Sequence, residues 1–355
     1  METRDTMQRR RFMQAMAAAS AAVCMPLGGR QAAAQGGQIT VTSYGGIWET
    51  AIKECFVADF EKKNPGAKAS VVLGGPAQWM GQVEANPSNP PVHTIMNTVG
   101  LSLIAGRKGL VEKISVEKVP NLKDVPARFA EVADWWGACF DYGSFGIAYH
   151  RDRVKNPPKS FAEFIERTAK GEWMAGLPTI SYPSTEQILI WSFSDILGGG
   201  VDNIDPFFKA ADRMRKNIVW WASVTDFLNQ LDSGEIDIGM YWDGRTWAHF
   251  DSGAKHIAYV NPKEGGVMNP VVVQKPKNAP DLVWKYIDSM FAPEPQAKFA
   301  QMLNYGVTNS KVVLSATLKE RITPWEQTRW PPFEKIAEKL PEWTERWNKE
   351  IGKKG

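Results

Sequence analysis

The sequence alternates between segments typical of strands and segments typical of helices, and this alternation limits the possible folds more than any other feature. The stretch QITVTSY alternates in polarity and is rich in β-branched residues, which predicts a strand. Ile52, Phe56 and Phe60 then recur at helical spacing until Asn64-Pro65-Gly66 ends the helix. A chain that repeats this order folds as an α/β domain with a mainly parallel sheet. The expected strands of this first unit are 38–44, 68–73 and 92–97, and its expected helices are 47–63 and 101–107.

A second unit of the same kind follows further along the chain. Ser160-Phe161-Ala162-Glu163 has the order of a capping box at a helix start, and Gly198-Gly199-Gly200 closes the next helix. A chain of 355 residues is long enough for two domains of ordinary size. The expected strands are 143–149, 179–182, 236–241 and a return run at 271–273, and the expected helices are 186–197, 207–215, one from 225, 280–291, 293–303 and 332–349.

The first residues have the order of a secretory signal. Arg9-Arg10-Arg11-Phe12 precedes a weakly apolar stretch over 16–27, and Ala32-Ala33-Ala34 offers an A-x-A cleavage site. The arginines resemble a twin-arginine signal, which a receptor reads, and the alternative is a basic tail followed by an alanine-rich helix. We expect residues 1–34 to be a twin-arginine-like signal peptide and the exported chain to begin at Gln35. No later segment reaches the roughly 18 apolar residues that a membrane span needs.

Charge and reactive residues argue against several other classes of protein. Lys and Arg number 42 against 39 Asp and Glu, and the lysines are scattered, so we expect no nucleic-acid partner. The four histidines lack metal-ligand spacing, no nucleophile motif of the GxSxG type occurs, and no carboxylate pair stands out. We therefore expect no enzyme activity, no catalytic residues, no metal and no cofactor.

The three cysteines give little information about the compartment. Cys24 lies in the expected signal after Val23, where a lipid-anchored protein would need a small residue. Cys55 and Cys139 can form one disulfide in an oxidising compartment or remain two buried thiols, and the sequence leaves both possibilities open.

The densest mixture of aromatic and charged residues is GMYWDGRTW at 239–247. It follows a predicted strand, so its side chains emerge at the carboxyl edge, where ligands bind in open α/β sheets. Tryptophan faces bind cations, and arginine binds carboxylates. The alternative is a helix start in which Asp243 is the cap and Trp242 and Trp247 pack inside.

Three further segments are candidates for the same edge. Tyr44-Gly45-Gly46 lies where a strand meets a helix, which either brings a ligand to the helix start or is only a tight turn. Ser184 and Gln187 have capping-box spacing, and capping does not exclude ligand contact. Of the pairs Trp135-Trp136 and Trp220-Trp221, we interpret the first as packing and expect Trp221 to face a pocket.

A series of short motifs also occurs in a recognisable order along the chain. They are TSYGG at 42–46, RKGLV at 107–111, YGSFGIAY at 142–149, SGEIDIG at 233–239, YWDG at 241–244, PKEGG at 262–266 and YGVTN at 305–309. Each motif alone is loose, but their order over most of the exported chain is specific. The chain resembles the bacterial extracellular solute-binding proteins of family 1, on the branch similar to the spermidine/putrescine-binding proteins.

This resemblance implies an α/β fold of the periplasmic-binding-protein type II, in which two α/β lobes are joined by crossing strands with a ligand cleft between them. The crossings are expected near 143–149 and 262–273. The resemblance places lobe 1 at residues 35–145 and 265–320, lobe 2 at residues 146–264 and a C-terminal helical segment at residues 321–355.

The resemblance also assigns ligand contacts in both lobes. Polyamine binders hold ammonium groups with acidic side chains, but here the corresponding positions fall on Ser184, Gln187 and a residue near Val271. A multiply charged cation is costly to bury without paired carboxylates, so the ligand class stays open. The ligand-binding residues that the resemblance implies are Tyr44, Trp48, Thr98, Ser184, Gln187, Trp221, Trp242, Asp243, Arg245 and Asn269.

Together these features predict the periplasmic substrate-binding component of an ABC importer, a monomer that passes its ligand to permease subunits. The ligand is expected to be a small organic solute: an amine, an amino-acid derivative or a polyamine-like compound. Arg245 and the helix start at Gly46 suit a carboxylate, and the aromatic residues suit a cation, so a zwitterion fits both. The alternatives are an exported enzyme on the same scaffold and a ligand-sensing accessory protein for a membrane receptor.

Protein recovered from its host should begin near Gln35 and carry no lipid, as N-terminal sequencing and intact mass would show. Replacing Arg9 and Arg10 together by Lys should reduce export, because the twin-arginine receptor reads the arginine pair. An intact Met1 on a cytoplasmic protein would contradict the signal, and undiminished export of the double variant would exclude the twin-arginine route.

Overall fold

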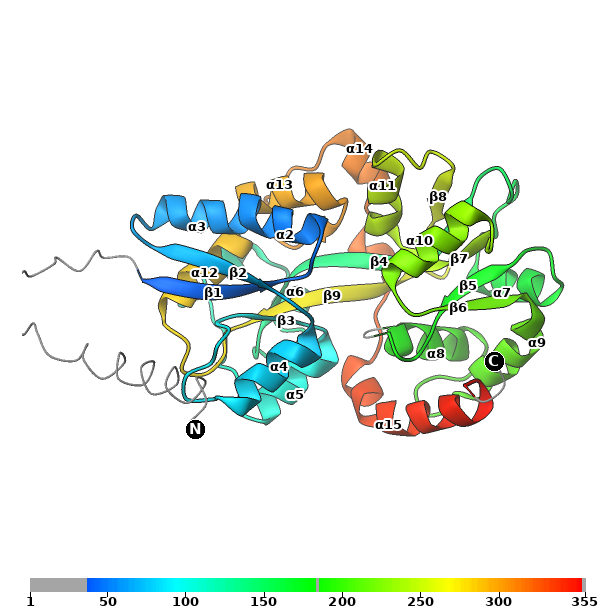
Figure 1. Ribbon diagram of the computed structural model, residues 1–355, viewed down its shortest axis with the longest axis horizontal. Helices are drawn as coiled ribbons and strands as arrows, with labels where there is room; N and C mark the ends of the chain where they lie inside the picture. Colours follow the sequence, from blue (N-terminus) through cyan, green and yellow to red (C-terminus); the bar gives the residue numbers. More distant parts are fainter. Residues whose placement is uncertain (1–36, 183–184, 353–355) are drawn as a thin grey trace, which may run out of the picture. The chain divides into compact units, whose positions relative to one another are not determined.

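In a computed structural model of the protein, which describes residues 37–182 and 185–352, two long antiparallel strands run side by side through a large mixed sheet (Figure 1). They are β4 (Ala138–His150) and β9 (Gly266–Gln274), paired from Ala138 opposite Val273 to Phe145 opposite Val267. The sheet order is β11 (Thr328–Arg329), β9, β4, β7 (Ile238–Trp242), β5 (Ala175–Pro178) and β6 (Ile218–Trp221). In addition, β3 (Ile95–Asn97) pairs with β9, and β8 (Ile257–Val260) and β10 (Gly306–Val307) pair with β4. The expected signal at 1–34 lies outside the described residues.

The first hydrophobic core lies around the amino-terminal part of β4. Ala138, Phe140 and Tyr142 belong to it, with Phe56 and Phe299 stacked edge to face against Phe140. The helix expected over 47–63 is present, although its middle turn is a π-helix. The elements around this core are β1 (Gln38–Ser43), α2 (Ile47–Ala51), the π-turn Ile52–Val57, α3 (Ala58–Lys63), β2 (Lys68–Leu73), α4 (Pro76–Ala85), β3 (Ile95–Asn97), α5 (Val99–Arg107), α6 (Ala127–Ala130), α12 (Leu282–Met290), α13 (Pro293–Leu303), β10 (Gly306–Val307) and α14 (Ala316–Arg321).

The second hydrophobic core lies around the carboxyl-terminal part of the same strand. Phe145 and Ile147 belong to it, although they are only a few residues beyond Tyr142 of the first core. The elements around this core are α7 (Phe161–Ala169), β5 (Ala175–Pro178), α8 (Thr185–Ile196), α9 (Asp205–Met214), β6 (Ile218–Trp221), α10 (Val224–Ser233), β7 (Ile238–Trp242), α11 (Asp243–Asp251), β8 (Ile257–Val260) and α15 (Phe333–Glu350). One strand therefore supplies side chains to both cores.

Local sequence signals set the helix ends largely as expected. The backbone N–H of Glu163 donates to Ser160 Oγ at 2.9 Å, so Ser160 caps α7, while the Glu163 carboxylate accepts from the N–H of Lys159. Gly234 ends α10 at φ 86°, a left-handed conformation that glycine adopts without strain. The carboxyl-terminal α15 contacts both α5 and α8.

Several strands differ from their expected bounds: β4 and β9 begin five residues earlier than expected, and β7 begins two residues later. The strand expected at 179–182 lies at Ala175–Pro178, because the chain turns after Pro178 and the N–H of Tyr182 donates back to the Thr179 carbonyl. The third strand begins at Ile95, three residues later than expected. Small side chains in AGLP gave no alternating pattern to mark the strand at Ala175–Pro178.

Cys55 and Cys139 are both free and buried, so the structure answers the open question in favour of two thiols. Burial raises the pKa of the Cys55 thiol to about 11, and burial next to Asp141 raises the pKa of Cys139 well above its usual range. Among the described residues, no helix combines the length and the apolar character needed to cross a membrane.

Close packing beside β4 predicts opposite effects for two glycine substitutions. A methyl group at Gly306 would lie 2.2 Å from the Tyr142 ring, which is itself stacked on Phe129, so Gly306→Ala should lower the free energy of unfolding by about 1–3 kcal/mol. Gly81 lies inside helix α4, with nothing within 4 Å of an added methyl group. Because alanine favours the helix more than glycine does, Gly81→Ala should raise the free energy of unfolding by about 0.5–1 kcal/mol. Urea unfolding measures both, and a neutral Gly306→Ala would contradict this packing.

Candidate ligand-binding site

A cavity of about 390 Å³ is lined by residues from both cores and from β9. Its wall combines aromatic rings with one arginine and several polar groups. The residues that line it are Tyr44, Gly45, Trp48, Gly74, Gly75, Pro76, Asn97, Thr98, Tyr182, Val224, Trp242, Arg245, Asn269, Pro270, Val271 and Tyr305.

Six of the ten expected site residues lie on this wall. They are Tyr44, Trp48, Thr98, Trp242, Arg245 and Asn269. Ser184 lies outside the described residues. Gln187 belongs to α8, but the structure does not describe its side chain. Trp221 and Asp243 are described, but neither is on the wall.

The strand-to-helix turn after β1 supplies two of the aromatic residues. Gly46 has φ 69°, which favours glycine, and this turn places Tyr44 and Trp48 with their ring centres 5.1 Å apart. The ring of Tyr305 lies 5.7 Å from that of Trp48. Thr98 caps α5, because its hydroxyl accepts from the N–H of Leu101 at 3.4 Å. Capping thus fixes one polar wall residue, and edge-to-face packing fixes the aromatic ones.

Arg245 lies in the first turn of α11 and contributes the positive charge of the cavity. The ionisable groups with the largest influence on it are four tyrosines (Tyr305, Tyr241, Tyr182 and Tyr44). Burial raises the pKa of each of these phenols, so they stay neutral. Among the side chains that the structure describes, those of residues 37–182 and 189–352, no ion pair includes Arg245.

Trp242 lies on the wall of the cavity, and Trp221 packs behind it. Trp242 is 3% exposed and packs on Phe145 with ring centres 4.8 Å apart, so it belongs both to the wall and to the second core. Trp221 is fully buried, with its ring 5.9 Å from that of Trp242. The expectation that Trp221 faces the pocket thus differs from the structure, in which Trp242 and Tyr182 stand next to it.

Asp243 holds the backbone together rather than lining the cavity. Its carboxylate accepts from the N–H groups of Ser144 at 3.0 Å, Gly244 at 2.7 Å and Thr323 at 3.2 Å. Burial raises the pKa of Asp243 to about 6, although these hydrogen bonds oppose the rise. The side chain therefore connects β4 to the start of α11, which is the turn that carries Arg245.

One buried carboxylate next to the cavity was missed in the sequence. Asp141 lies on β4 opposite Val271, and Gly143 on the same face lies opposite Asn269; both partners line the cavity. A methyl group at Gly143 would lie 2.8 Å from the Tyr305 ring, which shows that this face of β4 supports the wall. The bulge between Cys139 and Asp141 sets this register.

The Asp141 carboxylate is fully buried, and neither of its oxygens has a hydrogen-bond partner among the described residues. Burial raises the pKa of Asp141 well above its usual range. Its charge also contributes to the raised pKa values of Tyr44 and Tyr305, two residues of the wall. A single Asp within the apolar run ACFDYG was the only sequence signal for it.

A second cavity of about 480 Å³ shares Trp48, Val224, Arg245 and Tyr305 with the first. Arg245 therefore borders both cavities. The two cavities thus lie on either side of the Arg245 guanidinium and share the aromatic residues Trp48 and Tyr305. Cavities lined by aromatic rings with a few polar groups are typical of binding sites for small organic solutes.

The two cores, the shared strands and a cavity lined from both sides define a two-lobed protein of the type II periplasmic-binding fold. Residues 56–323 match the family model described as bacterial extracellular solute-binding protein. The chain belongs to this family, and the resemblance found in its motifs is confirmed. It is a solute-binding protein, and the family as a whole is extracellular.

Relatives in the family bind different small solutes. The gamma-aminobutyric acid-binding protein of Pseudomonas aeruginosa is 24% identical over 311 residues, covering 82% of this chain and 83% of the relative. The thiamine-binding periplasmic protein of Salmonella typhimurium is 24% identical over 219 residues, covering 60% of this chain and 64% of the relative.

Solved structures share the fold over nearly the whole chain. A putative extracellular solute-binding protein from Bordetella parapertussis has a TM-score of 0.79 at 28% identity, covering 88% of this chain and 98% of that one. The structure of a GABA receptor has a TM-score of 0.73 at 23% identity, covering 88% of this chain and 96% of that one.

The raised pKa of Asp243 predicts a pH-dependent contribution to stability. The folded protein binds a proton at Asp243 up to about pH 6, whereas the unfolded chain releases it near 3.8, so this stability is present below about pH 4 and is lost as pH rises through 6. Relative to Asp243→Asn, which does not titrate, wild type should lose up to roughly 3 kcal/mol between pH 4 and 7. Urea unfolding across this range tests it, and a pH-independent difference would contradict the shift.

Proposed function

We propose that this protein captures a compact zwitterion, with one carboxylate and one ammonium group, for an ABC-type importer in the periplasm. The observation that carries the proposal is a pair of buried groups of opposite type at one end of the β4–β9 pair: Arg245, which lines the cavity and makes no ion pair with a described side chain, and Asp141, which lies opposite the wall residue Val271 and whose carboxyl oxygens have no partner among the described residues. A ligand that brings one charge of each sign neutralises both.

Arg245 is suited to the carboxylate end of such a ligand. Its guanidinium offers a planar set of N–H donors that match the two oxygens of a carboxylate. Tyr44 and Tyr305 line the same cavity with neutral side chains, so we propose that their hydroxyls complete the hydrogen bonds of the ligand without competing for the charge of the arginine.

Asp141 and the aromatic rings are suited to the ammonium end. A carboxylate without a partner is costly to bury, and a ligand cation repays this cost by pairing with it. Tyr44, Trp48 and Trp242 also line the cavity, and we propose that their rings offer cation–π contacts to the same group. A single carboxylate matches one ammonium group, which favours an amino acid over a polyamine.

The relatives support this ligand class. The Pseudomonas aeruginosa protein that matches most of this chain binds gamma-aminobutyric acid, a zwitterion with its charges at opposite ends. Relatives that bind thiamine show that a cationic solute is also handled in this family. We propose that this chain, like its family, binds its solute without transforming it, and that it works as a monomer with no nucleic-acid partner.

Delivery to permease subunits requires a difference between the free and the loaded protein. We propose lobe 1 at residues 35–145 and 265–320, lobe 2 at 146–264 and the C-terminal segment at 321–355. Both crossings then lie on β4 and near β9, and bending there closes the lobes on the ligand. Ligand stabilises the closed form by its differential affinity for that form, which the transporter recognises.

Calorimetric titration of protein stripped of ligand by unfolding and refolding tests the ligand class. Gamma-aminobutyrate or 5-aminovalerate should bind at least thirtyfold more tightly than butylamine or butyrate. Butylamine lacks the carboxylate and butyrate lacks the ammonium group, so each of these two loses one charge pair worth about 2–5 kcal/mol to the complex. Putrescine and thiamine complete the panel. Equal affinity for butylamine and the zwitterions would overturn the proposal.

Two variants separate the ends of the ligand. Arg245→Gln and Asp141→Asn should each reduce affinity for the zwitterion at least thirtyfold, while the exposed Arg215→Gln serves as a charge-matched control. Asp141→Asn loses no hydrogen bond within the described residues, so its melting temperature without ligand should be unchanged or higher. A large loss of stability with unchanged affinity would place Asp141 among structural residues.

The raised pKa of Asp141 gives the same experiment a further readout. Because the free protein favours the protonated carboxyl, pairing with an ammonium group releases a proton, and affinity should rise with pH. Titration in two buffers of different ionisation enthalpy measures this release, which Asp141→Asn should abolish.

A further inference from the structure

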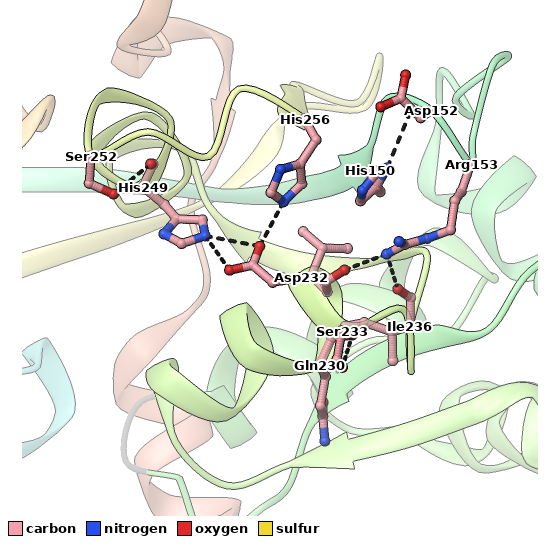
Figure 2. A network of polar contacts seen from close by, with 11 residues as sticks. His150, Asp152, Arg153, Gln230, Asp232, Ser233, Ile236, His249, Ser252 and His256 are labelled. Atoms are coloured by element: carbon pink, nitrogen blue, oxygen red, sulfur yellow. Dashed lines mark hydrogen bonds and ion pairs between the residues drawn. The ribbon is translucent and has the colours of Figure 1, made fainter.

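Three of the four histidines of the chain gather at one place, and one of them, His249, also lines the second cavity beside Arg245. His249 and His256 point toward the carboxylate of Asp232, and the ring of His150 stacks on that of His256 at 4.5 Å (Figure 2). The expectation of no metal site was based on sequence spacing, but the fold brings together residues that are 17 and 24 positions apart.

The donor atoms of this cluster converge. His249 Nε2 lies 2.9 Å and 3.1 Å from the two oxygens of Asp232, and His256 Nε2 lies 2.7 Å from one of them. One ligand atom from each of the three residues lies within 4.8 Å of the others. Two imidazole nitrogens and one carboxylate are the ligand types that zinc takes in proteins.

Each ligand comes from a different element, and the backbone fixes its position. Asp232 lies near the end of α10, His249 near the end of α11, and His256 directly before β8. The carbonyl of His256 accepts from the N–H of Arg151 at 2.7 Å, and the carbonyl of His249 accepts from Ser252 Oγ at 2.8 Å. The three side chains therefore meet because of tertiary structure and not because of a flexible loop.

The charges around the cluster also suit a cation. Asp232 is the acidic member of the cluster, and its carboxylate contacts both His249 and His256. Arg153 is paired with Asp237 at 2.9 Å, and Lys255 Nζ donates to the Phe250 carbonyl, so neither neutralises Asp232. The side chains of Asp232, His249 and His256 are 38%, 20% and 28% exposed, which leaves a path from solvent.

We propose that Asp232, His249 and His256 bind Zn²⁺ through the carboxylate and the two Nε2 atoms, with water in the remaining position. Tetrahedral zinc at about 2.0–2.2 Å from its ligands sets the donor atoms roughly 3.3 Å apart, slightly wider than the present contacts. Zinc would take the place of the protons that now lie between each Nε2 atom and the Asp232 carboxylate. A small rotation of these partly exposed side chains would give the donor atoms the wider spacing that zinc needs. His150 supports the His256 ring, and its Nδ1 already accepts from the N–H of Asp152.

The bound ion would connect α10, α11 and β8 at one point. Arg245 and His249 are four residues apart on α11 and so lie on the same face of this helix. Zinc thus adds a fixed point one turn beyond the arginine. The site itself does not depend on the identity of the solute, so its test is independent of the proposed function.

Zinc titration of chelator-treated, tag-free protein without any organic ligand tests the site. Calorimetry should give one equivalent bound, Co²⁺ in its place should give the visible absorption of a four-coordinate ion, and Zn²⁺ should raise the melting temperature. His249→Ala, His256→Ala and Asp232→Asn should each weaken zinc binding at least tenfold.

Two further variants serve as matched controls. His93→Ala removes a histidine elsewhere in the chain, and His150→Phe keeps the stacking on His256, so both should bind zinc as wild type does. Circular dichroism without metal confirms that each variant is folded. Absence of a one-to-one complex, or zinc binding that persists at full strength in the combined Asp232, His249 and His256 variant, would overturn the proposal.

Discussion

The antiparallel pair of β4 and β9 is the constraint on which the rest of the structure depends. Side chains of β4 enter one core up to Tyr142 and the other from Phe145, so neither core is complete without this strand. The close positions on it are filled by glycine, as at Gly143 beneath Tyr305 and Gly146 beneath Tyr259. Because these side chains pack without room for a methyl group, the register of the pair fixes the wall of the cavity.

Opposite charges are held on different elements of this framework. Asp141 lies on β4 beside the first core, and Arg245 lies on α11, whose start is bound to β4 through Asp243. Buried ionisable groups without partners destabilise a fold, so the presence of Arg245 and Asp141 beside one cavity calls for a functional explanation. The proposed zwitterionic solute would supply it, because its carboxylate pairs with Arg245 and its ammonium group stabilises the ionised form of Asp141.

The sequence predicted most of the elements, because apolar residues repeat with clear periods in the long helices and in β4. It also predicted several residues of the cavity wall, such as Tyr44 and Arg245. These residues follow the ends of strands, and the position of a residue after a strand determines the edge of the sheet at which its side chain emerges. It could not separate Trp221 from Trp242, since each ends a strand and only packing decides which one meets the cavity. Asp141 and the histidine cluster depend on pairing between distant segments, which a single sequence does not reveal.

Helix α11 shows how these distant contacts combine. Its first turn is held by the Asp243 carboxylate against Ser144 and Thr323, and near its last turn His249 contacts Asp232. Arg245 therefore extends from a helix that is fixed at both ends, and its guanidinium needs little ordering when a carboxylate arrives. Ordering a flexible side chain on binding costs free energy, so a guanidinium that is already held in place binds a carboxylate at a smaller cost. Its fixed position also makes binding depend on where the carboxylate lies in the ligand. For the zwitterion proposed above, the fixed positions of Arg245 and Asp141 would then select the separation of the solute's charges as well as their signs.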